Sequence, residues 1–274
     1  MAEGQALTRL DILKQAFGEE HAQAFEENLN QVAQAHFDAY KYKLQQQRPV
    51  FEARSKIAAK IPHFWATSLG NSRAVSQFFD PVDEDALKHL TEVDIVHSEK
   101  DAREFEVKFT FSAKNPYFKE TTLSKKVTVT PPKSIKPAPE PVQSFDLEAP
   151  LYLLPGTSIT WTSKDHDLTA KKPRVKATDL EEFDNFDGNG SFFNWFAEEG
   201  EDAMSIAETL LEWWGHASEY AAGLASLDDV SDDEGSLGDF DFDDEDESED
   251  DDPKKEIDLS DDDRRPKKKA RSKK

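Results

Sequence analysis

The stretch EFEVKFTFSAKNPYFKETTLSKKVTVT, residues 104–130, alternates between apolar and polar side chains before a turn and continues into a second apolar segment. Every second residue from Phe105 to Phe111 is apolar, and the residues between them are Glu, Lys and Thr. This period of two is typical of an antiparallel strand that buries one face. Asn115-Pro116 predicts the turn, and Val127 with Val129 predicts a return strand. We therefore expect a hairpin whose apolar face is covered by other parts of the chain.

The segments on either side of this hairpin predict the rest of the sheet. EVDIV, residues 92–96, precedes the hairpin and SITWTS, residues 158–163, follows it, which gives about four antiparallel strands. Between residues 61 and 90 the pattern predicts short helices, with Asn71 and Asp83 as N-caps and Asp80-Pro81 as a stop.

A last helix is expected to cover the sheet, because apolar residues recur at helical spacing towards the acidic end of the chain. These residues are Ile206, Leu210, Trp213, Ala217, Tyr220, Leu224 and Leu227. The aromatic run before it, Phe192, Phe193, Trp195 and Phe196, is expected to anchor the edge of the core. The loop AEEGED, residues 197–202, joins the two and is acidic. The predicted fold class is α+β.

The first sixty residues predict helices almost throughout. Thr8 and Asp11 have capping-box spacing, and Gly18 is expected to end a short first helix. A second helix of about 40 residues would be roughly 60 Å long. Its apolar stripe, which we assign to dimerisation, consists of Phe25, Leu29, Val32, Ala35, Ala39 and Tyr42. A second copy of the same helix would bury this stripe, and the alternative is one helix lying along its own domain.

Charge divides the chain, whose formal net charge is −23 over 274 residues. Residues 228–263 hold 21 acidic residues and only two lysines, whereas residues 264–274 hold eight basic residues and no acid. Like-charged blocks of this length are expected to remain disordered. The domains expected from the sequence are therefore the helices of residues 1–60, an α+β domain at 61–227, an acidic tail at 228–263 and a basic segment at 264–274.

The basic segment RRPKKKARSKK is typical of a nuclear import signal, which predicts a nuclear protein. The residues assigned to this signal are Arg264, Arg265, Lys267, Lys268, Lys269 and Arg271. The alternative is that the segment folds back and neutralises the acidic tail.

Several function classes are disfavoured by composition. The chain has no cysteine, which excludes disulfides and thiolate chemistry, and no His pair has metal-binding spacing. Residues 185–196 resemble a calcium loop, but Phe196 stands where that loop requires a bidentate Glu. We expect no enzyme activity, cofactor, metal or membrane span, and the acidic charge argues against direct nucleic-acid binding.

Five motifs in this order resemble the nucleosome assembly protein family, and its SET-type branch with fungal members most of all. They are KIPHFWATSLGN at 60–71, DEDALKHLTEVDI at 83–95, KNPYFKETTLSKKV at 114–127, ITWTSKDHDLT at 159–169 and SFFNWF at 191–196. The resemblance covers residues 20–227. It implies a homodimer built on a long antiparallel helix pair, with an earmuff-shaped α+β domain of about four antiparallel strands packed with helices in each subunit.

The resemblance also implies a histone chaperone that binds core histones, H3-H4 or H2A-H2B or both, and supports nucleosome assembly. The acids expected to contact histones are Glu198, Glu199, Glu201 and Asp202, together with Glu181 and Glu182. A second interpretation is a SET-type regulator, acting as a partner of a histone acetyltransferase or as a phosphatase inhibitor. A third is an acidic interaction region in which Phe240 and Phe242 provide the contacts, and the ordered motifs argue against it.

Overall fold

The computed structural model describes residues 7–135, 145–174 and 189–225. All of them belong to one compact unit, Met1–Asp232. The acidic tail from residue 228, the basic segment, Leu227, Glu181 and Glu182 lie outside the described residues. The predictions for those parts therefore remain predictions.

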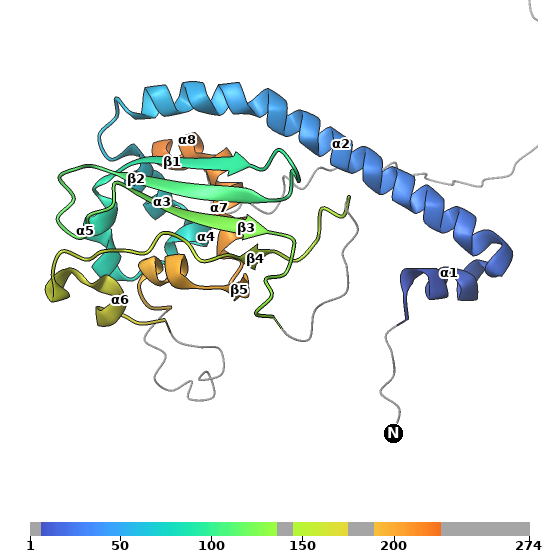
Figure 1. The fold of residues 1–274 in the computed structure, drawn as a ribbon. Coiled ribbons are helices and arrows are strands. Elements are labelled where there is room, and N and C mark those ends of the chain that lie inside the picture. The colour runs from blue at the N-terminus through green and yellow to red at the C-terminus, as the bar shows by residue number, and fades with distance from the viewer. Residues whose placement is uncertain (1–6, 136–144, 175–188, 226–274) are drawn as a thin grey trace, which may run out of the picture. The chain divides into compact units, whose positions relative to one another are not determined.

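Two helices, α1 and α2, come first in the chain (Figure 1). Helix α1, Arg9–Phe17, begins at Thr8, whose side chain forms the expected capping box with Asp11. Gly18 ends α1 with a φ of 80°, a backbone conformation that side chains with a Cβ rarely adopt. Helix α2, Glu19–Ala58, follows at once and runs for 40 residues through Pro49. The predicted break and the predicted long helix are both confirmed.

Helix α2 has two different apolar sides. One side packs on the domain, where the ring centroids of Phe51 and Trp214 lie 4.3 Å apart and Arg48 pairs with Asp94 at 2.8 Å. The Arg54 guanidinium lies over the same Phe51 and Trp214 rings. The other side carries the predicted stripe, which the chain leaves exposed. The C-terminal half of α2 thus packs on the domain, and the helix still exposes an apolar face.

Four short helices follow: α3 Phe64–Asn71, α4 Arg73–Ser76, the 3-10 helix η1 Pro81–Asp83, and α5 Glu84–Leu87. The prediction of Asn71 as an N-cap was wrong, because Asn71 ends α3 and the Ser72 hydroxyl accepts from the Val75 amide at the start of α4. Asp83 precedes α5 but does not cap it. Its carboxylate is buried and accepts from the Ser191 hydroxyl at 2.5 Å and the Phe192 amide at 2.8 Å.

The sheet is antiparallel throughout and has five strands in chain order. They are β1 Leu90–His97, β2 Phe105–Phe111, β3 Thr122–Thr128, β4 Tyr152–Leu153 and β5 Gly200–Glu201. The hairpin and the first strand agree with prediction, and Phe109 pairs with Val93 on one side and with Leu123 on the other. The strand predicted at SITWTS is not formed. There, Trp161 makes a single bridge to Phe118, and the sheet continues instead through β4 and β5.

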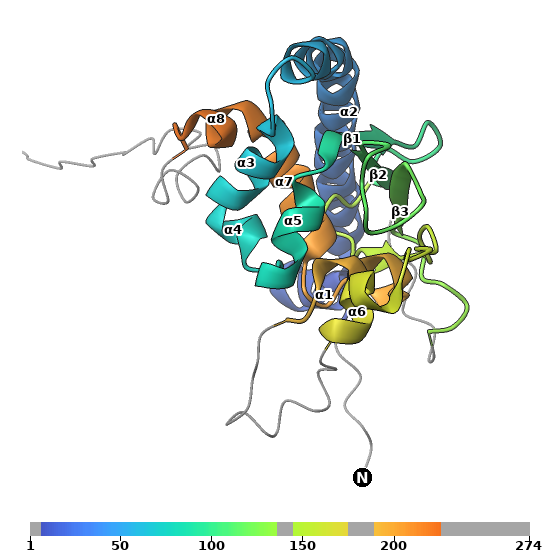
Figure 2. The same ribbon diagram turned by 90° about the vertical axis from the view of Figure 1, so that its left-hand side faces the viewer.

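The core lies on one face of this sheet, where helices α3, α4, α5, α7 and α8 gather (Figure 2). All four odd-numbered residues of β2 are buried, as predicted. The aromatic run forms the 3-10 helix η5, Phe192–Ala197, in which all four rings are buried. Phe109 contacts two of them, Phe192 at 5.5 Å and Phe196 at 5.8 Å between ring centroids. The prediction that these rings anchor the core is confirmed.

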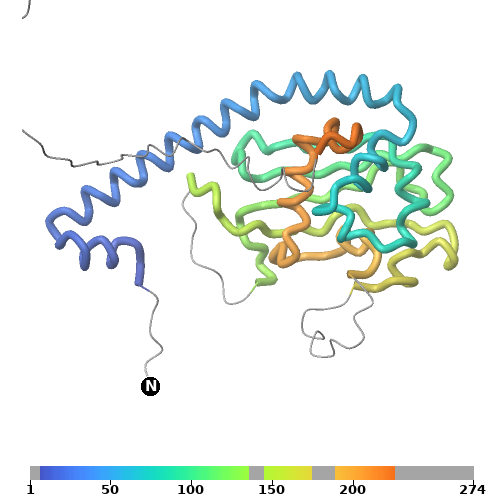
Figure 3. The backbone as a smooth tube through the Cα atoms, turned by 180° about the vertical axis from the view of Figure 1, so that it is seen from behind, coloured from blue at the N-terminus to red at the C-terminus, as the bar shows by residue number. Residues whose placement is uncertain are grey.

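The last predicted helix is two helices, α7 Ile206–Gly215 and α8 Ala217–Ala222, separated at His216. Helix α7 crosses the sheet (Figure 3), and the Trp214 indole donates to the Val93 carbonyl of β1 at 3.0 Å. Leu224, predicted as part of the buried face, lies beyond α8 and is 73% exposed. A short turn and helix, η2 Lys164–His166 and α6 Leu168–Lys171, complete the fold. Among the described residues no helix is long and apolar enough to cross a membrane.

Candidate functional site

The acidic loop of residues 197–202 is built into the edge of the sheet. Its residues Gly200 and Glu201 form β5, which pairs with Leu153 and Tyr152 of β4. Gly200 has a φ of 121°, a conformation accessible to glycine and strained for other residues. Strand pairing fixes the backbone of the loop, so its acidic side chains project from a defined position.

A buried lysine donates hydrogen bonds to the backbone of the same loop. Lys125 of β3 is fully buried, and its ammonium donates to the carbonyl of Phe196 at 3.3 Å and to the carbonyl of Glu198. Burial lowers the pKa of Lys125 to about 8, against the opposing effect of Glu198, Asp202 and Glu199. A cation beneath the loop thus balances part of the charge that the loop presents to solvent.

The four acids predicted to bind histones have different environments. Glu198 is partly buried and pairs with the Arg174 guanidinium at 2.7 Å. Glu199 is exposed and accepts from the Ser134 hydroxyl at 2.9 Å. Glu201 is exposed, and no described residue hydrogen bonds or pairs with its carboxylate. Glu199 and Glu201 are therefore the acids of the loop that are open to a partner.

Asp202 has a structural role that the sequence analysis missed. Its carboxylate accepts from the Ile206 amide at 3.2 Å and the Ala207 amide at 2.8 Å, and so caps the start of α7. Burial raises the pKa of Asp202, and the amide hydrogen bonds oppose that rise. The sequence offers no capping signal at Asp202, because a capping residue normally stands directly before the helix, where Ser205 lies.

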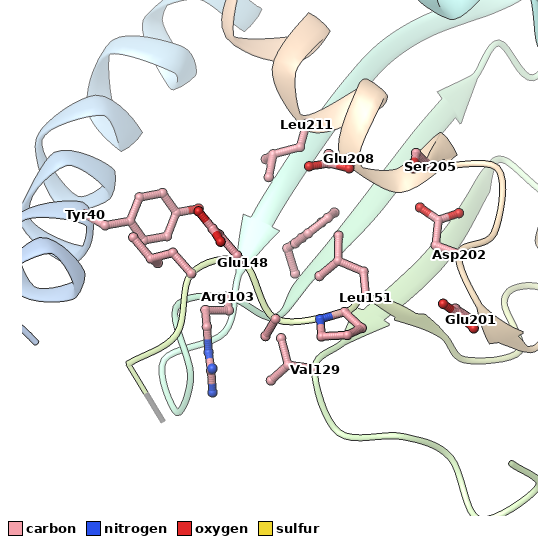
Figure 4. A pocket seen from close by; sticks show the side chains of 14 residues that line it. Tyr40, Arg103, Val129, Glu148, Leu151, Glu201, Asp202, Ser205, Glu208 and Leu211 are labelled. Carbon is pink, nitrogen blue, oxygen red and sulfur yellow. The ribbon is translucent and has the colours of Figure 1, made fainter. Parts of the chain in front are cut away.

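A cavity of about 360 Å³ opens beside the acidic loop, between α2, the sheet and α7 (Figure 4). Sequence reasoning did not predict it, because its walls come from five separate segments. Glu148, Glu201, Asp202 and Glu208 contribute carboxylates, and Val129, Leu147, Leu151 and Leu211 contribute apolar surface. No sequence pattern groups the acids Glu148 and Glu208 with the loop.

The predicted dimerisation residues also share one environment. Phe25 is 46% exposed, Leu29 41%, Val32 48% and Tyr42 64%. Ala35 and Ala39 are exposed as well. Further along α2, Val50 and Ile57 are exposed to 63% each, so the stripe extends over most of the helix. The structure leaves these residues on the surface of α2, where Phe17 of α1 contacts Phe25 at 4.8 Å between ring centroids and so covers one end of the stripe.

Among the residues that the structure describes, no group of three or more His, Asp or Glu side chains is placed to hold a metal ion. Of the calcium-like loop, Asn185 and Asp187 lie outside the described residues. Phe196, at its twelfth place, is 1% exposed within the core.

The fold and the charge together define a class of protein. Its sheet carries an acidic loop at one edge, and its long N-terminal helix exposes apolar side chains. The chain belongs to the nucleosome assembly protein family, whose family model, "Nucleosome assembly protein (NAP)", matches residues 8–259. The family predicted from the motifs is confirmed.

Two relatives illustrate the degree of similarity. Protein SETSIP of Homo sapiens is 28% identical over 191 residues, which cover 69% of this chain and 57% of that protein. NAP1-related protein 1 of Oryza sativa subsp. indica is 28% identical over 156 residues, or 56% of this chain and 50% of that protein. The chain therefore spans about half of the length of these relatives.

Solved structures share the fold. The crystal structure of Ccp1 has a TM-score of 0.56 at 24% identity and covers 75% of this chain and 97% of that one. Nucleosome assembly protein S from Plasmodium falciparum has a TM-score of 0.52 at 24% identity, with 76% and 98% covered. The Vps75 histone chaperone has a TM-score of 0.51 at 18% identity, with 74% and 97% covered.

Proposed function

We propose that this protein is a nuclear histone chaperone that binds core histones as a homodimer and supports nucleosome assembly. The observation that carries the proposal is the acidic loop, in which Glu199 and Glu201 stand open to solvent on a backbone fixed by β4 and by buried Lys125. Family membership and the name of the Vps75 histone chaperone support the same function. Bound histones would be kept from aggregating by neutralisation of their positive charge, without a chemical step.

The net charge of the protein fits a cationic partner. Outside the acidic tail and the basic segment, residues 1–227 hold 36 acidic and 24 basic residues. A field of this sign speeds the encounter with lysine- and arginine-rich histones and disfavours encounter with the phosphates of DNA. Carboxylates fixed on a folded edge then make directed, charge-assisted hydrogen bonds with arginine and lysine.

Sedimentation velocity tests the proposal directly. The full chain is run alone and with purified H3-H4 and H2A-H2B at about 0.15 M salt, where exposed charges more than roughly 8 Å apart are largely screened. We expect the protein to sediment as a dimer and at least one histone complex to sediment with it. Failure of both histone complexes to bind would refute the proposed function.

A charge-reversal pair separates a site from total charge. Glu199→Lys with Glu201→Lys should weaken histone binding by at least about tenfold, because two directed ionic hydrogen bonds are replaced by repulsion. The matched control is Glu99→Lys with Asp165→Lys, two exposed acids that lie outside the acidic loop and change the net charge equally. Equal losses in the two variants would show that only total charge matters.

A further inference from the structure

The cavity beside the acidic loop has a polar rim and an apolar floor. In Figure 4, Tyr40 and Glu148 lie towards one end, Glu201 and Asp202 lie towards the other, and Leu151 lies between them. Glu208 and Leu211 of α7 complete the wall above Leu151. Its volume of about 360 Å³ is at the small end of ligand pockets, the size for one long side chain and its backbone rather than a folded element.

Three carboxylates at this cavity have no partner among the residues that the structure describes. The exposed side chains of Glu148, Glu201 and Glu208 have no hydrogen bond or ion pair to any residue that the structure describes. The carboxylate of Asp202 is engaged by the amides of α7. Arg103, the cation among the lining residues, is held by Asp101 at 2.7 Å and by the carbonyl of Asp146 at 2.9 Å. The cavity is therefore negative at its rim.

The apolar residues at the floor of the cavity can pack against methylene groups. Val129 and Phe105 are buried beneath it, Leu151 and Leu211 are partly exposed, and Leu147 at the rim is 43% exposed. A side chain lying on them would bury apolar surface that the chain itself leaves open, which stabilises the contact. A side chain with an aliphatic stem and a positive charge would contact the apolar floor and pair with the carboxylates at the rim.

We propose that this cavity receives a single arginine side chain from an extended basic segment of a bound histone. The proposal rests on the proposed function and names a contact within it. Arginine fits better than lysine, because its planar guanidinium pairs with carboxylates through two parallel hydrogen bonds and is weakly hydrated. Its methylene stem lies on Leu147 and Leu151, while the guanidinium reaches Glu148 and Glu208. The Tyr40 ring at the same end offers an aromatic face to the cation.

A small probe tests the cavity without any histone. N-acetyl-arginine amide is titrated into the full chain with labelled leucine methyl groups, and N-acetyl-citrulline amide, which is neutral and of nearly the same shape, is the control. We expect saturable shifts of the Leu147, Leu151 and Leu211 methyl signals with the arginine probe and at least fivefold weaker binding of the citrulline probe. Equal effects of both probes, or no shift at these three leucines, would overturn the proposal.

Variants then test the contact within the histone complex. Glu148→Gln with Glu208→Gln removes two charges from the cavity and should weaken histone binding about fivefold or more. Glu99→Gln with Asp165→Asn removes two exposed charges elsewhere and should change binding less than twofold. Leu147→Ser keeps the charge and removes part of the floor, so it should weaken binding about threefold. Leu224→Ser, at a residue exposed to 73% outside the cavity, should have no effect.

The outcomes separate this proposal from the proposed function. If the unaltered chain binds no histones, the function fails, and the arginine probe still decides whether the cavity binds arginine. If the unaltered chain binds histones and both cavity variants match their controls, the cavity proposal is overturned while the function stands. Thermal unfolding of each variant, unchanged from the unaltered chain, shows that a loss of binding is not a loss of fold.

Discussion

Asp202 illustrates how the environment of one acidic residue decides its role. Its carboxylate satisfies two of the amides that have no partner within the first turn of α7. Glu201, the preceding residue, has the same charge and is exposed. Charge reversal at Asp202 would therefore disturb the fold as well as the surface, and Asp202 is unsuitable for testing histone binding.

We predict that Asp202→Ala lowers the free energy of unfolding by roughly 1 to 2 kcal/mol, the usual loss when a helix cap is removed. Glu201→Ala should change the free energy of unfolding by less than about 0.5 kcal/mol, as is usual at exposed positions. Urea unfolding followed by tryptophan fluorescence measures both. Equal stability of the two variants would show that Asp202 does not cap α7 in solution.

Lys125 gives a prediction about pH. Its pKa is about 8 in the folded protein and 10.5 for the ordinary side chain, because burial disfavours the charged form. Between these values the unfolded chain binds the additional proton, so the stability contributed at this residue rises as pH increases from about 8 to about 10.5. We expect Lys125→Met to remove that rise. Urea unfolding of both proteins at pH 8 and pH 10 provides the comparison, and the same pH dependence in the two would contradict it.

Asp83 and Asp202 show what residue-level sequence reasoning lacks. The sequence predicts a helix cap at Asp83 and a histone contact at Asp202, yet both carboxylates accept hydrogen bonds within the fold. For Asp83 the donors are Ser191 and Phe192, more than a hundred positions away. The period of two in β3 places Lys125 on the same buried face as Leu123 and Val127, but a lysine charge is rarely buried, so the sequence analysis did not single it out.

At the level of elements, α2 carries the dimer prediction. Its exposed stripe lies on a different side from Phe51 and Arg48, which bind the domain, so a partner helix can cover the stripe without detaching α2. Leu29→Glu with Val32→Glu places two like charges in the predicted seam. We expect a monomer by sedimentation at micromolar concentration, because charges buried without partners are strongly unfavourable.

A matched control keeps this test specific. Gln31→Glu with Gln45→Glu adds two negative charges to exposed positions of the same helix outside the stripe, and this variant should remain a dimer. Circular dichroism of both variants checks that helix content is retained. If the unaltered chain already sediments as a monomer, the dimer prediction is wrong.

The elements predicted well are those that local periodicity defines. The 40-residue helix and the hairpin repeat their apolar pattern over many residues, so the sequence alone locates them. Strands β4 and β5 have two residues each, too few to show a period, and exist because β3 offers an edge. SITWTS alternates between apolar and polar residues like a strand. In the fold, however, only Trp161 of this segment forms a β-bridge, to Phe118, and no strand results. The cavity could not be predicted for the same reason, since its walls meet only in the fold.

At the scale of the whole molecule, the basic segment of residues 264–274 carries the localisation prediction. Deleting Arg264 to Lys274 removes eight positive charges of a lysine- and arginine-rich motif. A dimer of two 31.0 kDa chains is too large to rely on passive diffusion into the nucleus. We expect a fluorescent fusion of the shortened chain to be largely cytoplasmic. If it stays nuclear, the import signal lies elsewhere, and the next residues to change are Lys171, Lys172, Arg174 and Lys176, of which Lys176 lies outside the described residues.

The acidic tail and the acidic loop should respond differently to salt. The tail concentrates 21 acidic residues in positions 228–263, and its composition predicts an unfolded segment that acts through many screened charges. From about 0.1 M to about 0.5 M salt the Debye length falls from roughly 10 Å to below about 5 Å. The contribution of the tail to histone binding should therefore fall steeply, whereas directed hydrogen bonds from Glu199 and Glu201 should persist.

Truncation after Leu227 tests this difference in a salt-titrated affinity measurement. We predict that the truncated chain binds histones several-fold more weakly than the full chain at about 0.1 M salt, and nearly as well at about 0.5 M, because screening already suppresses the tail there. Glu199→Lys with Glu201→Lys in the full chain should weaken binding at both salt concentrations. If truncation costs as much at high salt as at low salt, then the tail makes specific contacts of its own and the folded edge is not the principal histone-binding surface.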